Sequence, residues 1–475
     1  MYRFSKKQWK ILKIHGYRRK NVSEEIHIND DIFRKKLVRL VLPIAFQQFM
    51  LAIVSASDAL MLGKVEQESL AAVSLAGQVT FVQNLFLGAM TIGTSMFAAQ
   101  YWGKGDKRSV EKVFAYVLKV TAIVSALFFA AGLAIPELLM KIFTNEPVLI
   151  ERGAQYLRVV ALSYLLSGIS QIYLCVLKNS EKAVKATTIS SVVVVLNVLL
   201  NALLIFGLWG LPRMEIAGAA LATVLAKVVE LIWCIAESMR KGGIRFRLSF
   251  AVKSDRVLRR DFWKYTAPAM GNQIIWGCGY TMYSVIMGHM GTDAVAANSI
   301  ANVVKSLMAC FCGGLGSGGG ILIGNELGAG KLERAKAYGD RLCRCAVWIG
   351  VISGGVLLAL IPFILKVTDL TPQAHHYLKW MLLMCTYYLV GKAITATNIG
   401  GIFCAGGDSR FGLICDTITM WCVTVPIGLI SAFVLKLPVL AVYMLINIDE
   451  IIKLPAVFSN YKKYRWVKDL TRKEV

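Results

Sequence analysis

The sequence contains one stretch that decides its fold class, Leu40-Val-Leu-Pro-Ile-Ala-Phe-Gln-Gln-Phe-Met-Leu-Ala-Ile-Val-Ser-Ala-Ser-Asp58-Ala-Leu-Met-Leu-Gly63. It is long enough to cross a bilayer, which takes about 20 apolar residues in a helix. Pro43 lacks a backbone donor and predicts a bend near one end. Asp58 places a carboxylate within hydrocarbon, at a cost of at least about 2.5–3.5 kcal/mol, and is therefore a candidate functional residue. An acid at the aqueous end of the helix is the open alternative, since Gly63-Lys64 closes the span.

The composition extends this interpretation to the whole chain. Its 475 residues are 56% hydrophobic and its mean hydropathy is +0.58, which excludes an ordinary soluble protein. The net charge is +24, and the basic residues gather in short segments between apolar runs. Anionic lipid headgroups are therefore the expected counter-charge, and no nucleic-acid partner is expected. The eleven cysteines include no CxxC pair, so we expect neither a disulfide framework nor a zinc site.

Apolar runs predict an all-α membrane protein with about twelve transmembrane helices. The predicted spans are 39–62, 70–102, 113–135, 154–177, 186–207, 217–235, 262–288, 294–327, 342–365, 377–404, 411–434 and 439–458. The longest hydrophilic stretch between them divides the spans six and six. We therefore expect a basic N-terminal segment 1–38, a first lobe 39–238, a linker 239–261, a second lobe 262–459 and a basic tail 460–475. Lysine and arginine concentrate in both termini and the linker, which predicts that these segments are cytoplasmic at the plasma membrane.

The second lobe repeats the first at a spacing of 225 residues without a gap. The shift relates Pro43 to Pro268 and Gln48 to Gln273, and it aligns glycines 63, 88 and 93 with glycines 288, 313 and 318. Because each half has an even number of spans, the lobes enter the membrane in the same direction and should be related by an axis along its normal. Two such lobes can expose a central cleft to either side in turn, which favours a transporter.

Several motifs are specific when they are taken together. They are Ala98-Ala-Gln-Tyr-Trp-Gly-Lys-Gly105, Ile323-Gly-Asn-Glu-Leu-Gly-Ala-Gly330, Asn197-Val-Leu-Leu-Asn201, Ala217-Gly-Ala-Ala-Leu-Ala-Thr223 and Gly406-Gly-Asp-Ser-Arg-Phe-Gly412. With Pro43 and Asp58, they make the chain resemble the multidrug and toxic compound extrusion (MATE) transporters over nearly its whole length. The resemblance implies two bundles of six helices and alternating access. It also implies export of bulky, often cationic or aromatic compounds in exchange for H⁺ or Na⁺.

The resemblance also suggests an ion-coupling site in the first lobe, at Asp58, Asn197, Asn201 and Thr223. Asn197 and Asn201 are four residues apart and share a helix face, although hydrogen bonding between helices would also account for them. Asn201 stands where this branch of the family often has a second aspartate. A site with one carboxylate suits a proton, or a Na⁺ helped by amide and hydroxyl oxygens, so the coupling ion stays open. No other metal and no cofactor is expected.

Further candidates lie near the predicted cleft. Gln48 and Gln273 should face it and contact substrate, together with Tyr283, which occupies the place of Asp58 in the second lobe. Pro43 and Pro268 are candidate hinges. Asp416 and Glu450 are intramembrane acids and thus possible additional sites. The alternatives are ordinary ion pairs, Asp416 with Arg410 and Glu450 with Lys453.

The predicted function is that of a monomeric secondary active antiporter for small molecules, embedded among membrane lipids. A lipid-linked saccharide flippase of the same superfamily is the alternative. Such a protein often has a cationic central cavity, whereas we expect little intramembrane Lys or Arg here beyond Lys119 and Arg158. The chain has no Walker motif, so we do not expect ATP to drive it directly. An enzyme is not expected, because no nucleophile–base constellation has a convincing context.

Overall fold

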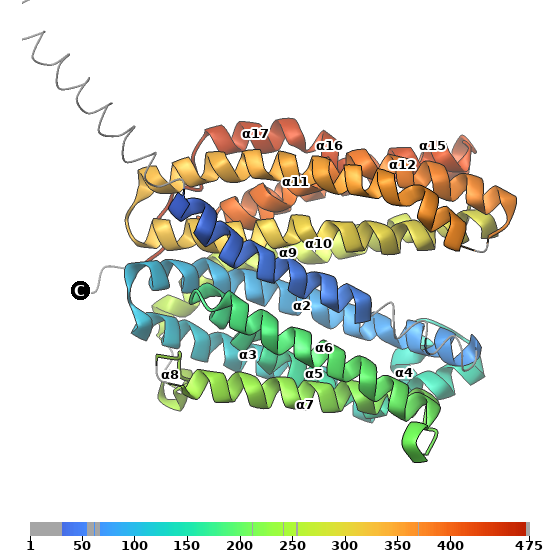
Figure 1. Cartoon of the computed structure of the whole chain (residues 1–475), viewed down its shortest axis with the longest axis horizontal. Helices are drawn as coiled ribbons and strands as arrows, with labels where there is room; N and C mark the ends of the chain where they lie inside the picture. The colour runs from blue at the N-terminus through green and yellow to red at the C-terminus, as the bar shows by residue number, and fades with distance from the viewer. Residues whose placement is uncertain are drawn as a thin grey trace, which may run out of the picture.

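A computed structural model describes residues 31–54, 61, 67–210, 212–240, 242–252, 255–368 and 370–471. Asp58 lies outside these residues. Within them the chain is helical and no strand is formed, so the predicted all-α fold class is confirmed. In Figure 1 the first half of the chain forms one bundle and the second half forms another beside it.

The first lobe is a bundle of six long helices with two short elements. The first helix spans Asp31–Val54. It is followed by α2 (Gln67–Lys104), α3 (Lys107–Ala134), α4 (Pro136–Lys141), α5 (Pro147–Asn179), α6 (Ala183–Phe206), η1 (Leu208–Gly210) and α7 (Glu215–Met239). The short helix α8 (Leu248–Val252) belongs to the linker and lies against α3, where the ammonium group of Lys119 donates to the Ala251 carbonyl.

The second lobe begins with three unbroken helices, α9 (Arg256–Gly288), α10 (Thr292–Gly328) and α11 (Leu332–Val367). Its last three predicted spans are irregular. They contain α12 (Pro372–Thr395) with the π-helix η2 (Ala396–Phe403); then α13 (Ser409–Asp416), η3 (Thr417–Thr424), α14 (Val425–Leu429) and η4 (Ile430–Val434); and finally α15 (Val439–Ile446), α16 (Asp449–Ile452) and α17 (Leu454–Lys462).

Nine helices of the described chain are long and apolar enough to cross a membrane. The three other predicted spans are helical too, but two of them are more polar, and the last is divided into short helices and carries Asp449, Glu450 and Lys453. They correspond to α9, to α12 with η2, and to α15 through α17. A span can carry polar side chains when they face a cavity or one another rather than lipid. These three helices are therefore the first place to look for a site.

Paired glycines explain how the lobes meet at one end. A Cβ at Gly103 of α2 would collide with the Asn325 carbonyl of α10, and one at Gly328 of α10 would collide with the Gln100 carbonyl of α2. The two contacts are related by the 225-residue shift. Two residues after each of these glycines, Gly105 and Gly330 adopt positive φ angles of 84° and 73°, which glycine tolerates without strain and which turn the chain into the next helix.

This end of the molecule is called the basic end below, because its turns carry Lys104, Lys107, Lys331 and Arg334. Here the adjoining ends of α2 and α10 lie side by side in Figure 1, and their opposite ends diverge in that view. The turn from α5 to α6 and the linker helix α8 lie at the same end.

The C-terminal tail crosses from one lobe to the other at the basic end. Trp466 is fully buried, with its ring against Gly339 and its carbonyl against Gly406. Gln100 of α2 donates to the carbonyls of Ala405 (2.7 Å) and Lys468 (3.1 Å), and it accepts from the Leu470 amide (2.6 Å). One buried side chain of the first lobe thus holds both the second lobe and the tail.

Gln100→Leu should therefore loosen the basic end. It removes three hydrogen bonds and leaves buried carbonyl groups unpaired, at about 1–3 kcal/mol each. We expect a lower unfolding midpoint and a wider distance distribution between spin labels placed at Arg108 and Lys336, one on each lobe. Thr188→Val, which removes a hydroxyl bonded only within α6, is the control. An unchanged label distance together with an unchanged midpoint would contradict the role given to Gln100.

Candidate functional site

A cavity of ≈ 450 Å³ lies between the two lobes. Gln48 of the first helix and Ile92 of α2 line it from the first lobe. The second lobe supplies the rest of the wall, including Asn272, Gln273, Trp276, Lys392, Thr395, Asp416, Glu450 and Lys453. The wall is thus split between two bodies, and most of its polar groups belong to the second.

The two repeat-related glutamines line this one cavity and approach the opposite lobe reciprocally. A Cβ built on Gly313 of α10 would lie 2.5 Å from Gln48 Oε1, and one built on Gly88 of α2 would lie 2.8 Å from Gln273 Nε2. Glycine at both places therefore makes room for the amides. The neighbouring Gln47 behaves differently, because it is buried inside the first lobe and donates to Ser190 of α6 at 2.7 Å.

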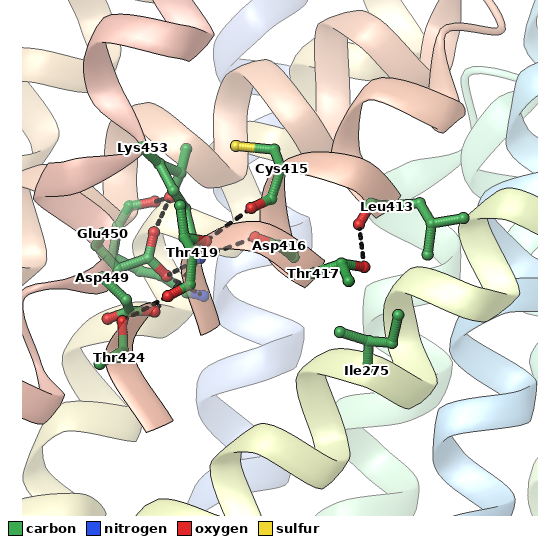
Figure 2. A network of polar contacts seen from close by, with 12 residues as sticks. Ile275, Leu413, Cys415, Asp416, Thr417, Thr419, Thr424, Asp449, Glu450 and Lys453 are labelled. Atoms are coloured by element: carbon green, nitrogen blue, oxygen red, sulfur yellow. Dashed lines mark hydrogen bonds and ion pairs between the residues drawn. The ribbon is translucent and has the colours of Figure 1, made fainter. Parts of the chain in front are cut away.

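Figure 2 shows a network of buried charges, of which Asp416, Glu450 and Lys453 also line the cavity. The Lys453 ammonium lies 2.8 Å from Asp416 Oδ1, 3.3 Å from Asp449 Oδ2 and 3.9 Å from Glu450 Oε1. The Lys392 ammonium lies 3.0 Å from Glu450 Oε1, and the Thr395 hydroxyl donates to the other oxygen of that carboxylate. Lys392 also lies over the ring of Trp276, 5.3 Å from its centroid.

The network is held together by mutual neutralisation. Asp449, Glu450 and Lys453 are at most 3% exposed, and a charge buried in this way is very costly unless it is paired. Lys453 and Lys392 contact the three carboxylates directly, and the neighbouring Lys305 supplies a third positive charge within electrostatic range of Asp449 and Glu450. Asp449 Oδ1 has no hydrogen-bond partner among the described residues. A carboxylate oxygen without a partner favours the binding of a proton.

Irregular backbone lies next to the charged groups. Asp416 ends α13 just before the π-helix η3, and Thr395 ends α12 just before the π-helix η2. The last span is interrupted at Asn447, between α15 and α16. Such π-helical turns are frequent at functional sites. Three successive spans contribute charged groups to this one network.

A third buried lysine lies next to this network. Lys305 of α10 is 8% exposed and donates to Asn447 Oδ1 at 3.1 Å. Its ammonium group lies over the rings of Tyr388 and Tyr280, at 4.9 and 5.9 Å from their centroids. Two aromatic faces and one amide therefore surround this cation.

The structure brings together two of the four ion-site candidates of the first lobe. Asn197 and Asn201 are buried on one face of α6, and the Asn201 amide donates to Asn197 Oδ1 at 3.3 Å. Thr223 of α7 donates to the Ala219 carbonyl of its own helix at 3.0 Å. The fourth candidate, Asp58, lies outside the described residues. Met61, three positions further on, packs against a cluster that contains Ile205 of α6.

The remaining candidates are Tyr283 and the two prolines, and none of them lines the described cavity. Tyr283 does not belong to the described lining of the cavity and packs against the core of the second lobe. It is ten residues from Gln273 along α9, a spacing that rotates it to another face of the helix. Pro43 and Pro268 both lie within continuous helices, so their role as hinges stays a prediction.

The ion pairs of the two acids differ from the simple alternatives considered above. Asp416 pairs with Lys453, not with the exposed Arg410. Glu450 does approach Lys453 within its own helix region, but it lies closer to Lys392 of α12. Both acids are thus members of a network that joins three spans.

The expectation of little intramembrane Lys or Arg is wrong. Lys305, Lys392 and Lys453 all lie within predicted spans and contribute to the polar interior of the second lobe. Their signal was present in the sequence, because a lysine inside an apolar span is by itself a functional hypothesis. Asn272 and Trp276, which line the cavity beside Gln273, gave no comparable signal.

Comparison with known proteins agrees with this architecture. A family model described as MatE matches residues 43–203 and 268–454, two segments that begin at the repeat-related prolines. The probable multidrug resistance protein NorM of Thermotoga maritima is 23% identical over 453 residues, covering 93% of this chain and 95% of the relative. The probable multidrug resistance protein YoeA of Bacillus subtilis is 24% identical over 414 residues, covering 85% and 88%.

The fold is also similar to solved structures. One is described as the outward-facing conformation of a multidrug resistance MATE family transporter of the MOP superfamily. It is 18% identical to this chain with a TM-score of 0.83, and the match covers 91% of this chain and 96% of that chain.

Proposed function

Because the chain belongs to the MatE family, whose members are membrane-embedded transporters and not enzymes, we propose that it is a secondary active multidrug efflux antiporter of the cell membrane. The observation that carries the proposal is the cavity whose wall is divided between two lobes. A binding site split in this way changes its access when one lobe rocks against the other. The reciprocal pairs of Gln48 with Gly313 and Gln273 with Gly88 mark the surfaces that would move.

The distribution of Lys and Arg supports one orientation of the protein in the membrane. Lysine and arginine concentrate at the basic end, so the positive-inside rule puts this end in the cytoplasm. The tight contacts of Gly103 and Gly328 then close the cytoplasmic side of the cavity. Inward opening requires these contacts to part, and the bonds of Gln100 to the tail would have to break as well.

The chemistry of the wall supports bulky cationic or aromatic substrates. Trp276 offers an aromatic face, Gln48 and Gln273 offer amide groups, and the carboxylates of Asp416 and Glu450 lie on the wall. Aromatic surface with a few polar groups is the usual lining of small-molecule sites. For the coupling ion, H⁺ or Na⁺, we propose the first-lobe site at Asp58, Asn197, Asn201 and Thr223.

One observation favours the lipid-linked saccharide flippase as a second candidate. Lys392 and Lys453 lie on the cavity wall, and cationic walls suit a diphosphate-linked substrate. Both lysines are already paired with carboxylates, however, so neither of these two wall cations is free to bind such a group. The antiporter is therefore the better supported of the two.

Reconstitution of the purified protein into vesicles separates the two functions. An imposed H⁺ or Na⁺ gradient should drive a fluorescent organic cation in the opposite direction, and an ionophore that collapses the gradient should abolish the movement. Movement of a lipid-linked saccharide between leaflets, together with no response of the organic cation to either gradient, would support the flippase and contradict our proposal.

The same assay tests the cavity residues. Gln48→Ala and Gln273→Ala should each raise the KM for the organic cation about 3- to 10-fold, because each removes about one hydrogen bond to substrate. Gln47→Ala is the matched control. Its amide bonds to Ser190 inside the first lobe, so it should lower the unfolding midpoint and leave the KM unchanged. A wild-type KM for both cavity variants would move the substrate site elsewhere.

A further inference from the structure

A second cavity of ≈ 610 Å³ lies on the seam between the lobes, and its wall is apolar. The first helix contributes Val38 and Leu42, α10 contributes Phe311, and α11 contributes Trp348 and Ile352. The side chains of Val38, Leu42 and Trp348 are 57%, 61% and 68% exposed, so the cavity is a groove on the outside of the protein. In a membrane-embedded chain this outside is lipid. The volume falls within the roughly 300–1,000 Å³ typical of small-molecule sites.

Unpaired positive charge lies at one end of this groove. Arg34 precedes Val38 by one turn of the first helix, Arg344 directly precedes Cys345 in α11, and both Val38 and Cys345 line the groove. Both arginines are exposed, and neither has a carboxylate at ion-pair distance among the residues that the structure describes. Nearby Lys36 and Arg334 differ, because both pair with Glu326, at 3.6 and 3.8 Å.

The groove lies on one of the two repeat-related seams between the lobes, and the other seam has a different side chain at the equivalent place. On the opposite seam the 225-residue shift puts Trp263 in the place of Val38. The Trp263 indole is half-buried and donates to the Tyr116 hydroxyl at 2.8 Å. Its ring also packs against Phe262. The side chain that would line the equivalent groove is therefore part of the first lobe's packing.

We propose that this groove binds an anionic phospholipid from the leaflet at the basic end. An acyl chain occupies the apolar wall, and the phosphate lies between Arg34 and Arg344. Arg34 is one helical turn from Val38, about 6 Å along the helix axis. The proposed phosphate position therefore adjoins the proposed acyl-chain position, as it must in a single lipid molecule. An arginine fork is well suited to phosphate oxygens. An excess of arginine at the membrane surface selects anionic over zwitterionic headgroups.

The site would also influence the conformation of the protein. Arg34 belongs to the first lobe and Arg344 to the second, so a single phosphate joins the two bodies. A ligand that contacts both binds one arrangement of the lobes more tightly than the other, and it shifts their equilibrium accordingly. The abundance of anionic lipid would thereby adjust the balance between open and closed states at the basic end.

Native mass spectrometry of the delipidated full-length protein tests the proposal. The probes are long-chain phosphatidylglycerol, phosphatidylcholine of the same chains, and dihexanoyl phosphatidylglycerol. We expect the long-chain anionic lipid to bind most tightly. Arg34→Gln/Arg344→Gln should weaken its binding roughly 10- to 30-fold and leave phosphatidylcholine unaffected. Arg256→Gln/Arg259→Gln is the matched control, since it removes two exposed charges at the start of α9 and should change nothing.

Val38→Trp tests the apolar wall separately. It copies the residue of the opposite seam and should reduce binding of both long-chain lipids. The result for Arg34→Gln/Arg344→Gln can be interpreted even if Val38→Trp fails to fold. Both arginines are exposed, so their substitution should not affect folding. Equal binding of phosphatidylglycerol to wild type and to Arg34→Gln/Arg344→Gln would overturn the proposal. Equal binding of the short-chain and long-chain probes would do the same, since the groove would then be unused.

Discussion

Lys453→Met is expected to destabilise the second lobe strongly. Lys453 is 2% exposed and contacts Asp416, Asp449 and Glu450 at once. Methionine matches its length but leaves three buried carboxylates with Lys392 as their remaining close cation. Removing one partner from a buried ion pair costs about 3–5 kcal/mol, because the other charge stays buried without compensation. The measurement is the thermal unfolding midpoint in detergent, together with the yield of folded protein.

Second-site variants separate loss of charge from loss of shape. Asp416→Asn or Asp449→Asn should restore part of the stability of Lys453→Met, because each removes one of the uncompensated charges. Lys336→Met is the surface control. Its partner Glu333 is 87% exposed, and exposed pairs contribute about 0–1 kcal/mol. A Lys453→Met protein that unfolds at the wild-type midpoint would show that the network does not need its shared cation.

Hydropathy predicted the helices well and their ends poorly. The span predicted as 217–235 corresponds to α7, Glu215–Met239, and that predicted as 342–365 corresponds to α11, Leu332–Val367. The missing turns of α11 include Leu332 to Arg341 and carry several charges. They extend past the apolar span, where apolar content no longer distinguishes helix from loop. Composition therefore locates the part of a helix that is in the bilayer.

The internal repeat was the most informative signal for the cavity. It singled out Gln48 and Gln273 without any structure, because polar residues recur at equivalent places only when both lobes use them. The same shift relates Gly103 to Gly328, and these two glycines make the close contacts at the basic end. Symmetry therefore carried information about packing between the lobes that no single motif contained.

The charge network could not be derived from local spacing. Lys392, Asp416 and Lys453 come from three different spans and meet only through the packing of these spans against one another. Sequence separation says nothing about such a meeting. Pairing each acid with the nearest basic residue in the sequence gave Arg410 as the alternative partner of Asp416, which is wrong. Counting all charged residues within the apolar spans, with Lys305, Lys392 and Lys453 among them, would have indicated that the second lobe has a polar interior.

The network raises a mechanistic question about where the coupling ion binds. The second lobe has the carboxylates of Asp416 and Glu450 at the cavity wall, whereas the first lobe has Asn197 and Asn201 together on α6. Asp58 precedes Met61 by three residues in the sequence and lies outside the described residues. Met61 packs against the Ile205 cluster, and Ile205 is one turn beyond Asn201. The ion site proposed for the first lobe therefore rests on the α6 amides and on the sequence position of Asp58.

Asp58→Asn should abolish ion-coupled export. The amide mimics the neutral carboxyl permanently, so the site no longer differs between its ion-bound and empty states. Coupling depends on that difference, because an ion with equal affinity for both conformations of the lobes moves neither. Efflux of a fluorescent cation from energised cells should fall to the level of cells without the protein. Binding of the same cation to the purified variant should stay within about threefold of wild type, because the cavity wall is intact.

Glu68→Gln is the control for Asp58→Asn. It neutralises an exposed carboxylate in the first turn of α2, ten residues further along the chain, and should leave efflux unchanged. Expression and unfolding midpoints of both variants are compared with wild type, so that lost transport is not mistaken for lost folding. Normal efflux by a well-folded Asp58→Asn protein would assign the first-lobe carboxylate a structural role. Coupling would then belong to the second lobe, and Asp416→Asn and Glu450→Gln should abolish export in its place, since these are the acids on the cavity wall.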